Sequence, residues 1–184
     1  MPRSSSPQRT CNAYHEAGHA VVGHVLGRRI KEITIRPSAA IRAKVKGACG
    51  YCAFDPESEE TEGITAWGPG IDNPQSIAIL LVGAVAYVRL SYERDWSVTD
   101  LIDGCSNDVQ AAGFLSARLT KTELGRKRLF NREERHAINL VNDYWEQVEA
   151  VAIALISRGT LSGEHVNEII LDTNVGWSCA TDPS

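Results

Sequence analysis

Apolar residues recur at helical spacing along most of this chain. The first such stretch predicts a helix that starts after a cap at Thr10 or Asn12 and runs to about Leu26, with Gly27 as its stop. Similar apolar stripes predict further helices over about 107–119 and 132–157, and a last one that begins after a cap at Ser162.

Residues 75–90 form the most apolar of the predicted helices. Asp72 or Asn73, followed by Pro74, provides a start signal for it. Because this stretch is apolar nearly all round, it predicts a helix in the centre of the core. Its longest apolar run, Ile77–Val88, is too short to span a bilayer, so we expect it to be buried in protein.

Two short stretches have a strand composition instead. Residues 30–36 are rich in β-branched residues and end at Pro37, and a second strand is predicted around 50–54. The expected fold class is therefore mainly α with a small antiparallel β-sheet. We find no internal repeat and expect one domain over 10–171, a disordered leader over 1–9 and a flexible tail over 172–184.

Composition agrees with one globular domain, since 43% of the 184 residues are hydrophobic and 23% are charged. The net charge of −4 gives no electrostatic footprint for nucleic acid or an anionic membrane, so we expect neither as a partner. The first nine residues lack the apolar segment of a secretory signal. Five cysteines without such a signal predict reduced thiols and a cytoplasmic location.

The candidate chemistry lies in the first helix, where His15, Glu16 and His19 form a His-Glu-x-x-His pattern. Residues four apart lie on one face of a helix, so both imidazoles can bind one metal ion. In zinc peptidases with this pattern, the glutamate is the base for a metal-bound water. The pattern therefore predicts His15 and His19 as zinc ligands and Glu16 as the general base.

A third ligand must come from elsewhere in the chain. The extended motif with a third histidine needs glycine at 22 and histidine at 25, but this chain has Val22 and Val25. A downstream acid is the alternative, and the apolar helix over 75–90 contains none. Asp108 heads the inward stripe of the 107–119 helix and has no obvious partner in the sequence, so it is the best candidate.

The segment 13–22 resembles the signature of the FtsH-type zinc peptidase domain. The resemblance continues through 33–37, 50–51, 77–86 and 104–109, of which 104–109 is the most specific. It returns weakly at 159–164, so it covers about 10–171 in patches. It implies an FtsH-type, mostly helical peptidase fold whose His-Glu-x-x-His helix is zincin-like, with Zn²⁺ as cofactor and Asp108 as the third ligand. It also implies a peptide or polypeptide substrate along a strand edge, here Gly50, Tyr51, Cys52, Ala53 and Phe54.

The chain departs from that family in two respects. The sequence contains no phosphate loop, so we expect this chain itself to act without ATP. A separate ATPase is a possible partner, and the chain could also form a homo-oligomer. The family's apolar helix usually ends in Ala-Ala-Glu, whereas this chain has Val85, Ala86 and Tyr87.

Together these features predict a zinc-dependent metalloendopeptidase. The first alternative is a catalytically impaired binding or regulatory protein that keeps the peptidase fold. The second is a thiol-based metal or redox module built on Cys49 and Cys52, although two ordinary strand cysteines are a simpler interpretation of that pair.

Overall fold

The computed structural model describes residues 6–38, 50–55, 73–96 and 102–178. Within these ranges the protein is mainly helical and has a small three-stranded antiparallel sheet, as the sequence predicts. The elements are α1 (Pro7–Val25), β1 (Ile30–Thr34), β2 (Tyr51–Phe54), α3 (Pro74–Glu93), α4 (Ile102–Leu119), α5 (Glu123–Asp143), α6 (Trp145–Arg158), β3 (Thr160–Ser162) and α7 (Gly163–Ser178).

Helix α1 begins earlier than its sequence predicts. Its N-cap is Ser6, whose side chain accepts from the Arg9 amide at 3.3 Å, rather than Thr10 or Asn12. Residues 7–9, which we assigned to a leader, therefore form its first turn. The Arg9 guanidinium donates to the carbonyl of Ile156 at 2.6 Å, which attaches this turn to the end of α6. The first turn of α1 is therefore held both by its Ser6 cap and by a hydrogen bond to a distant helix.

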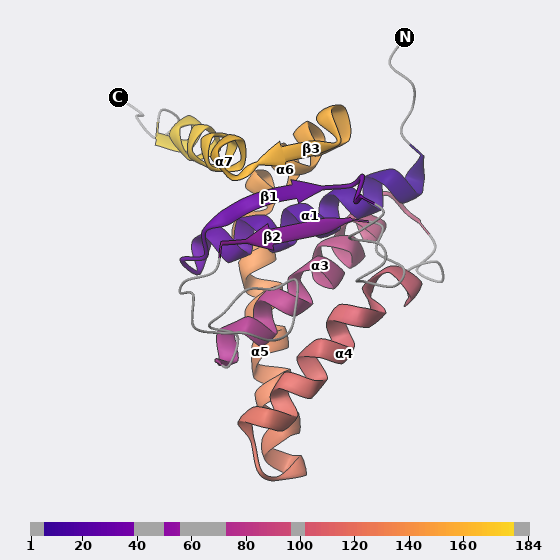
Figure 1. The fold of residues 1–184 in the computed structure, drawn as a ribbon, viewed down its shortest axis with the longest axis vertical. Coiled ribbons are helices and arrows are strands. Elements are labelled where there is room, and N and C mark those ends of the chain that lie inside the picture. Colours follow the sequence, from indigo (N-terminus) through magenta and orange to yellow (C-terminus); the bar gives the residue numbers. More distant parts are fainter. Residues whose placement is uncertain (1–5, 39–49, 56–72, 97–101, 179–184) are drawn as a thin grey trace.

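The sheet has the strand order β2-β1-β3 and lies along one side of α1 (Figure 1). Ile33 on β1 is opposite Cys52 on β2 and Leu161 on β3, and all three side chains are buried. The antiparallel pairing of β1 with β2 confirms the two predicted strands. The third strand was missed, because three residues between two helices carry no readable alternation. Among the described residues, β2 is an edge of the sheet.

Helix α1 lies between the sheet and α3, with α6 alongside it, and contributes a large part of the core (Figure 1). Asn73 caps α3 as predicted, accepting from the Ser76 amide at 3.0 Å. By length and composition alone, α3 is the one helix of the described chain that could cross a membrane. Two thirds of its most apolar window is buried within the protein, which is also the behaviour of a core helix.

The three remaining predicted helices differ from their expected bounds. Helix α4 starts at Ile102, so Ser106 is inside it and is not its cap. The single helix expected over 132–157 is two helices, α5 and α6, separated at Tyr144. Helix α7 follows Ser162, whose hydroxyl accepts from the His165 amide at 3.4 Å as expected of a cap. It continues to 178, so part of the predicted tail is helical.

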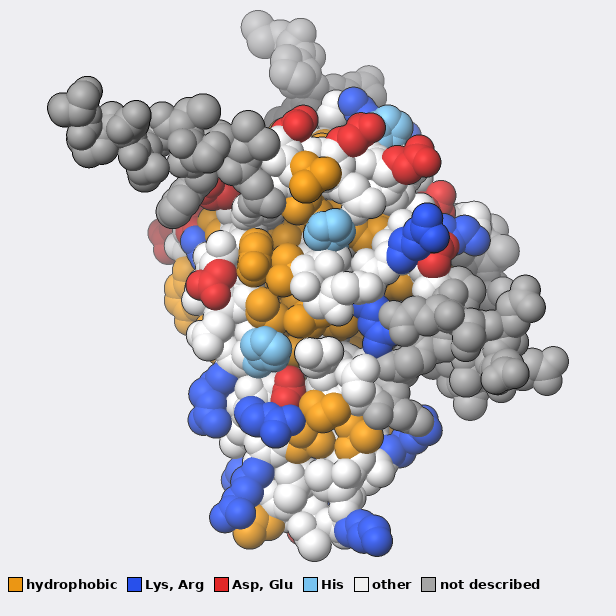
Figure 2. Space-filling model, turned by 90° about the vertical axis from the view of Figure 1, so that its left-hand side faces the viewer, with side chains coloured by type: hydrophobic (Ala, Val, Ile, Leu, Met, Phe, Trp, Pro, Cys, Tyr) orange, Lys and Arg blue, Asp and Glu red, His pale blue; other side chains and the backbone are white. Residues whose placement is uncertain are grey.

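Charge is unevenly distributed over the surface. Figure 2 shows Lys and Arg side chains concentrated toward one end of the molecule and most acidic side chains toward the other. The basic end is the turn between α4 and α5, where the exposed cations are Arg118, Lys121, Arg126, Lys127 and Arg128. The net charge of −4 therefore conceals a locally basic end.

Candidate functional site

The predicted site residues come from two helices. His15, Glu16 and His19 lie on α1, and Asp108 lies on α4. His19 is completely buried, Glu16 and Asp108 are buried, and His15 is partly exposed. Four polar side chains in the wall of an apolar core need partners, because an unpaired buried charge is costly. Their arrangement is therefore informative about function.

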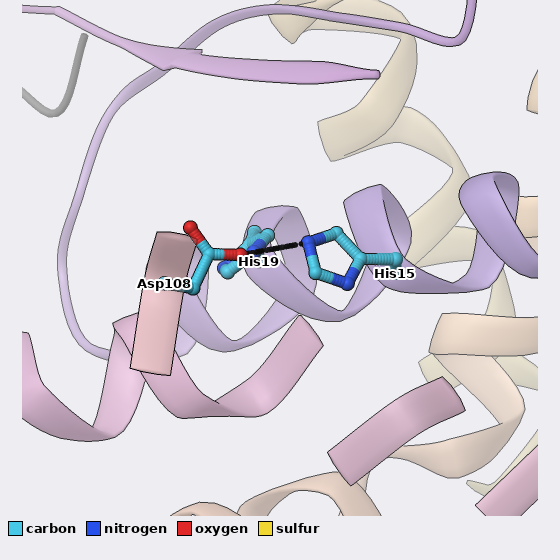
Figure 3. Close-up of side chains that lie close together, drawn as sticks. All are labelled: His15, His19 and Asp108. Carbon is cyan, nitrogen blue, oxygen red and sulfur yellow. Dashed lines mark hydrogen bonds and ion pairs between the residues drawn. The ribbon is translucent and has the colours of Figure 1, made fainter. Parts of the chain in front are cut away.

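The side chains of His15, His19 and Asp108 converge (Figure 3). Asp108 Oδ2 lies 2.9 Å from His15 Nε2 and 3.3 Å from His19 Nε2. The two Nε2 atoms lie 3.1 Å apart. All three donor atoms thus lie within 4.8 Å of one another, close enough to bind one cation. Two imidazole nitrogens and one carboxylate oxygen are a ligand set that suits zinc.

A hydrogen bond to the backbone of α3 fixes the orientation of the His19 ring and so the direction of its Nε2 atom. His19 Nδ1 lies 2.7 Å from the carbonyl oxygen of Ile79 on α3. A carbonyl only accepts, so Nδ1 carries the proton and donates, and Nε2 is left facing Asp108. Backbone carbonyls commonly orient metal-binding histidines in this way. This partner could not be found in the sequence, because any residue type supplies a carbonyl.

The charges at the site shift several pKa values. Burial alone would lower the pKa of His15, but hydrogen bonds with Asp108 and Cys105, together with the charges of Glu16 and Asp108, hold it well above its ordinary value. Burial would raise the pKa of Asp108, yet the hydrogen bonds from His15 and His19 hold it well below its usual range. Glu16 behaves differently: burial raises its pKa, and the two histidines oppose this only in part.

Two glycines leave the space that these side chains occupy. A Cβ on Gly83 of α3 would lie 2.5 Å from His19 Nε2 and 2.6 Å from His15 Cε1. A Cβ on Gly50, just before β2, would overlap the Glu16 carboxylate. We predicted Gly50 as a site residue but missed Gly83. The sequence offered one signal for Gly83: it is a single glycine within an otherwise apolar helix, and such a glycine often has a packing or functional reason.

The remaining predicted substrate residues lie on β2, with different surroundings. Cys52 and Phe54 belong to the core cluster, and Phe54 packs against Gly23 of α1. Ala53 is buried and Tyr51 is partly exposed. The side chains of Cys52 and Phe54 therefore fill the core, and β2 leaves its backbone edge and the partly exposed Tyr51 side chain outside it.

The cysteines form no metal cluster among the described residues. Burial raises the pKa of the Cys52 thiol well above its ordinary value, and the nearby charges of Glu16 and Asp108 add to this rise. Cys11, Cys52 and Cys105 are all free and buried. Cys49, the other half of the Cys-x-x-Cys pair, lies outside the described residues. Cys105 was not predicted, yet its sulfur lies 3.5 Å from His15 Nδ1.

Comparison with known proteins adds one relative. No family model matches the chain. Over 124 residues it is 30% identical to the ATP-dependent zinc metalloprotease FtsH of Mesomycoplasma conjunctivae. The chain is distantly related to FtsH. The matched stretch is 66% of this chain but only 14% of that FtsH, so this chain spans a small part of its relative.

The relationship to FtsH and the geometry point to the same chemistry. FtsH carries the name of a zinc metalloprotease, and this chain brings two histidines and an aspartate together at a point that could hold a metal ion. The Glu16 carboxylate follows His15 directly in α1 and is buried beside the site. A protease-related function is therefore the interpretation that the comparison supports.

Proposed function

We propose that this protein is a zinc-dependent metalloendopeptidase, with His15, His19 and Asp108 as zinc ligands and Glu16 as general base. The observation that carries the proposal is the convergence of His15 Nε2, His19 Nε2 and Asp108 Oδ2 next to the buried Glu16 carboxylate. The distant relationship to FtsH supports it independently.

The residues present fit a zinc ion. Three atoms that can each offer a lone pair meet at one point, and the Nδ1 proton of His19 is already committed to the Ile79 carbonyl. Gly83 keeps a side chain out of the same space. Zinc held there would supply Lewis acidity, lowering the pKa of a water to about 7 and polarising a peptide carbonyl.

Glu16 would act as the proton carrier of the reaction. Its carboxylate accepts a proton from the attacking water and passes it to the departing amine. Burial raises the pKa of Glu16, whereas the charge of a bound zinc ion would lower it and keep the carboxylate ionised, ready to accept a proton. The absence of a side chain at Gly50 leaves the Glu16 carboxylate room against β2.

The substrate would bind as an added strand on the edge of β2. Among the described residues β2 pairs with β1 alone, so its outer backbone groups are available for such pairing. The buried Cys52 and Phe54 offer no side-chain contacts there, so backbone hydrogen bonds would dominate and the selection of sequence would be broad. Peptide substrates, a separate ATPase partner, self-association and a cytoplasmic location all remain part of the proposal.

The substitution Glu16→Gln tests the mechanism. Glutamine keeps the size of the side chain but cannot take a proton, so we expect unchanged zinc content and a loss of cleavage of roughly 10²–10⁴-fold on casein or a peptide library. Glu133→Gln is the matched control, because Glu133 is a buried carboxylate on α5 that pairs with Arg132 and His136.

Full cleavage by the Glu16→Gln variant would reject the proposed mechanism. A wild-type protein that binds zinc stoichiometrically but cleaves nothing would favour the alternative of a catalytically impaired binding or regulatory protein. A wild-type protein that binds no zinc would reject the metal site itself.

A further inference from the structure

Helix α4 contacts both ring nitrogens of His15. Asp108 Oδ2 lies 2.9 Å from His15 Nε2, and Cys105 Sγ lies 3.5 Å from His15 Nδ1. Residues three apart lie on the same face of a helix, which explains how Cys105 and Asp108 reach opposite edges of one ring. Cys105 is buried, with 8% of its surface exposed. The ring of His15 is therefore held from both sides by one helix.

The two histidines obtain their Nδ1 partners in different ways. His19 bonds to the Ile79 carbonyl, which belongs to the backbone of α3. His15 has a side-chain sulfur at the equivalent position. His19 is also completely buried, whereas His15 is partly exposed and so is less restrained by packing. The orientation of His15 thus depends more strongly on a single replaceable group.

We infer that Cys105 is a positioning residue for His15, with its sulfur accepting a hydrogen bond from Nδ1–H and thereby turning Nε2 toward the metal position. This inference rests on the proposed zinc site. A thiol sulfur is a weak acceptor, but at 3.5 Å it lies within reach of an imidazole N–H. Loss of such an outer partner typically weakens metal binding by about 10- to 100-fold.

Cys11 provides a matched control for Cys105. It is a buried cysteine that hydrogen-bonds to Tyr87. Its charge interacts with that of Cys105, but no described hydrogen bond joins it to the ring of either histidine. Removing its sulfur makes a cavity of the same kind as removing that of Cys105. A general packing effect would therefore affect both variants, whereas a positioning effect is specific to Cys105.

The test compares Cys105→Ala, Cys105→Ser and Cys11→Ala with the wild type. Cobalt(II) replaces zinc as the probe, since its visible absorption reports ligand geometry, and affinity is measured against a chelator. We expect Cys105→Ala to bind cobalt about 10- to 100-fold more weakly and with an altered spectrum. Cys105→Ser, whose hydroxyl can accept the same hydrogen bond, should recover most of the affinity, and Cys11→Ala should match the wild type.

A second measurement does not depend on the folding of any variant. Nitrogen-15 NMR of the zinc-loaded wild type should show the His15 ring protonated at Nδ1. An unprotonated Nδ1, or a Cys105→Ala variant with the affinity and spectrum of the wild type, would overturn the inference while leaving the zinc site intact. Equal losses in Cys105→Ala and Cys11→Ala, without recovery by serine, would also overturn it. A wild type that binds neither cobalt nor zinc would instead overturn the proposed function.

Discussion

Gly83→Ala should separate the stability of the fold from the integrity of the site. The new methyl group would lie 2.5 Å from His19 Nε2 and 2.6 Å from His15 Cε1, whereas ordinary van der Waals contact begins at 3.4 Å. The rings must therefore retreat by about 0.9 Å, the gap between those values. His19 cannot do so freely, because it is completely buried and bonded to the Ile79 carbonyl.

The effect on the free energy of unfolding should be small. Alanine is favoured over glycine in a helix interior by about 0.8–1.0 kcal/mol. Overpacking of a core typically costs about 1–3 kcal/mol, so the two terms leave a net destabilisation of roughly 0–2 kcal/mol. Zinc affinity should fall far more, because metal–ligand distances tolerate only about ±0.2 Å. We expect a loss of at least the roughly 10- to 100-fold that follows removal of an outer partner.

The assay measures urea unfolding of the metal-free protein and zinc affinity by chelator competition for each variant. Gly113→Ala is the control, because Gly113 lies within α4 and a Cβ there would meet no atom within 4 Å. It should stabilise the protein by up to about 1 kcal/mol and leave zinc affinity unchanged. A Gly83→Ala variant that binds zinc as tightly as the wild type would refute the reasoning.

Two further predictions concern the neighbours of the site. Gly50→Ala should displace the Glu16 carboxylate, so we expect zinc content to be kept and peptide cleavage to fall at least tenfold; unchanged cleavage would show that Glu16 is not confined by β2. Burial and the nearby Glu149 carboxylate raise the pKa of Tyr14 to about 12 from its usual 10. The unfolded chain therefore loses this proton first, and stability that is fully present below pH 10 should fall by roughly 3 kcal/mol as pH rises through 12. Tyr14→Phe should lack this alkaline loss in urea unfolding, and identical pH profiles would contradict the prediction.

Local signals were sufficient for much of the fold. The apolar stripe of α4 placed Asp108 inward, and the structure brings it to His15 and His19. The caps at Asn73 and Ser162 were also read correctly, since each depends on residues within one turn. The role of the site residues as zinc ligands and base remains a prediction.

What the sequence did not reveal depends on contacts between distant segments. The break at Tyr144 has no proline or glycine to mark it, and the Ser6 start of α1 is coupled to Ile156 on another helix. Gly83 and Cys105 matter only because the backbone of α3 and side chains of α4 meet the rings of the two histidines on α1. A polar motif can be recognised in the sequence, but the distant residues that pack around it cannot.

The position of α1 has a consequence for how the protein would acquire its metal. The same helix that carries His15 and His19 also buries Tyr14, Val21 and Val22 in the core, with the Tyr14 ring against Trp145 of α6. Its place is fixed by apolar packing, so folding alone assembles the binding pocket, unlike a zinc finger that is unstructured until the ion arrives. At the proposed site, the chain would therefore fold before it binds zinc, and a chelator would remove the ion without unfolding the protein.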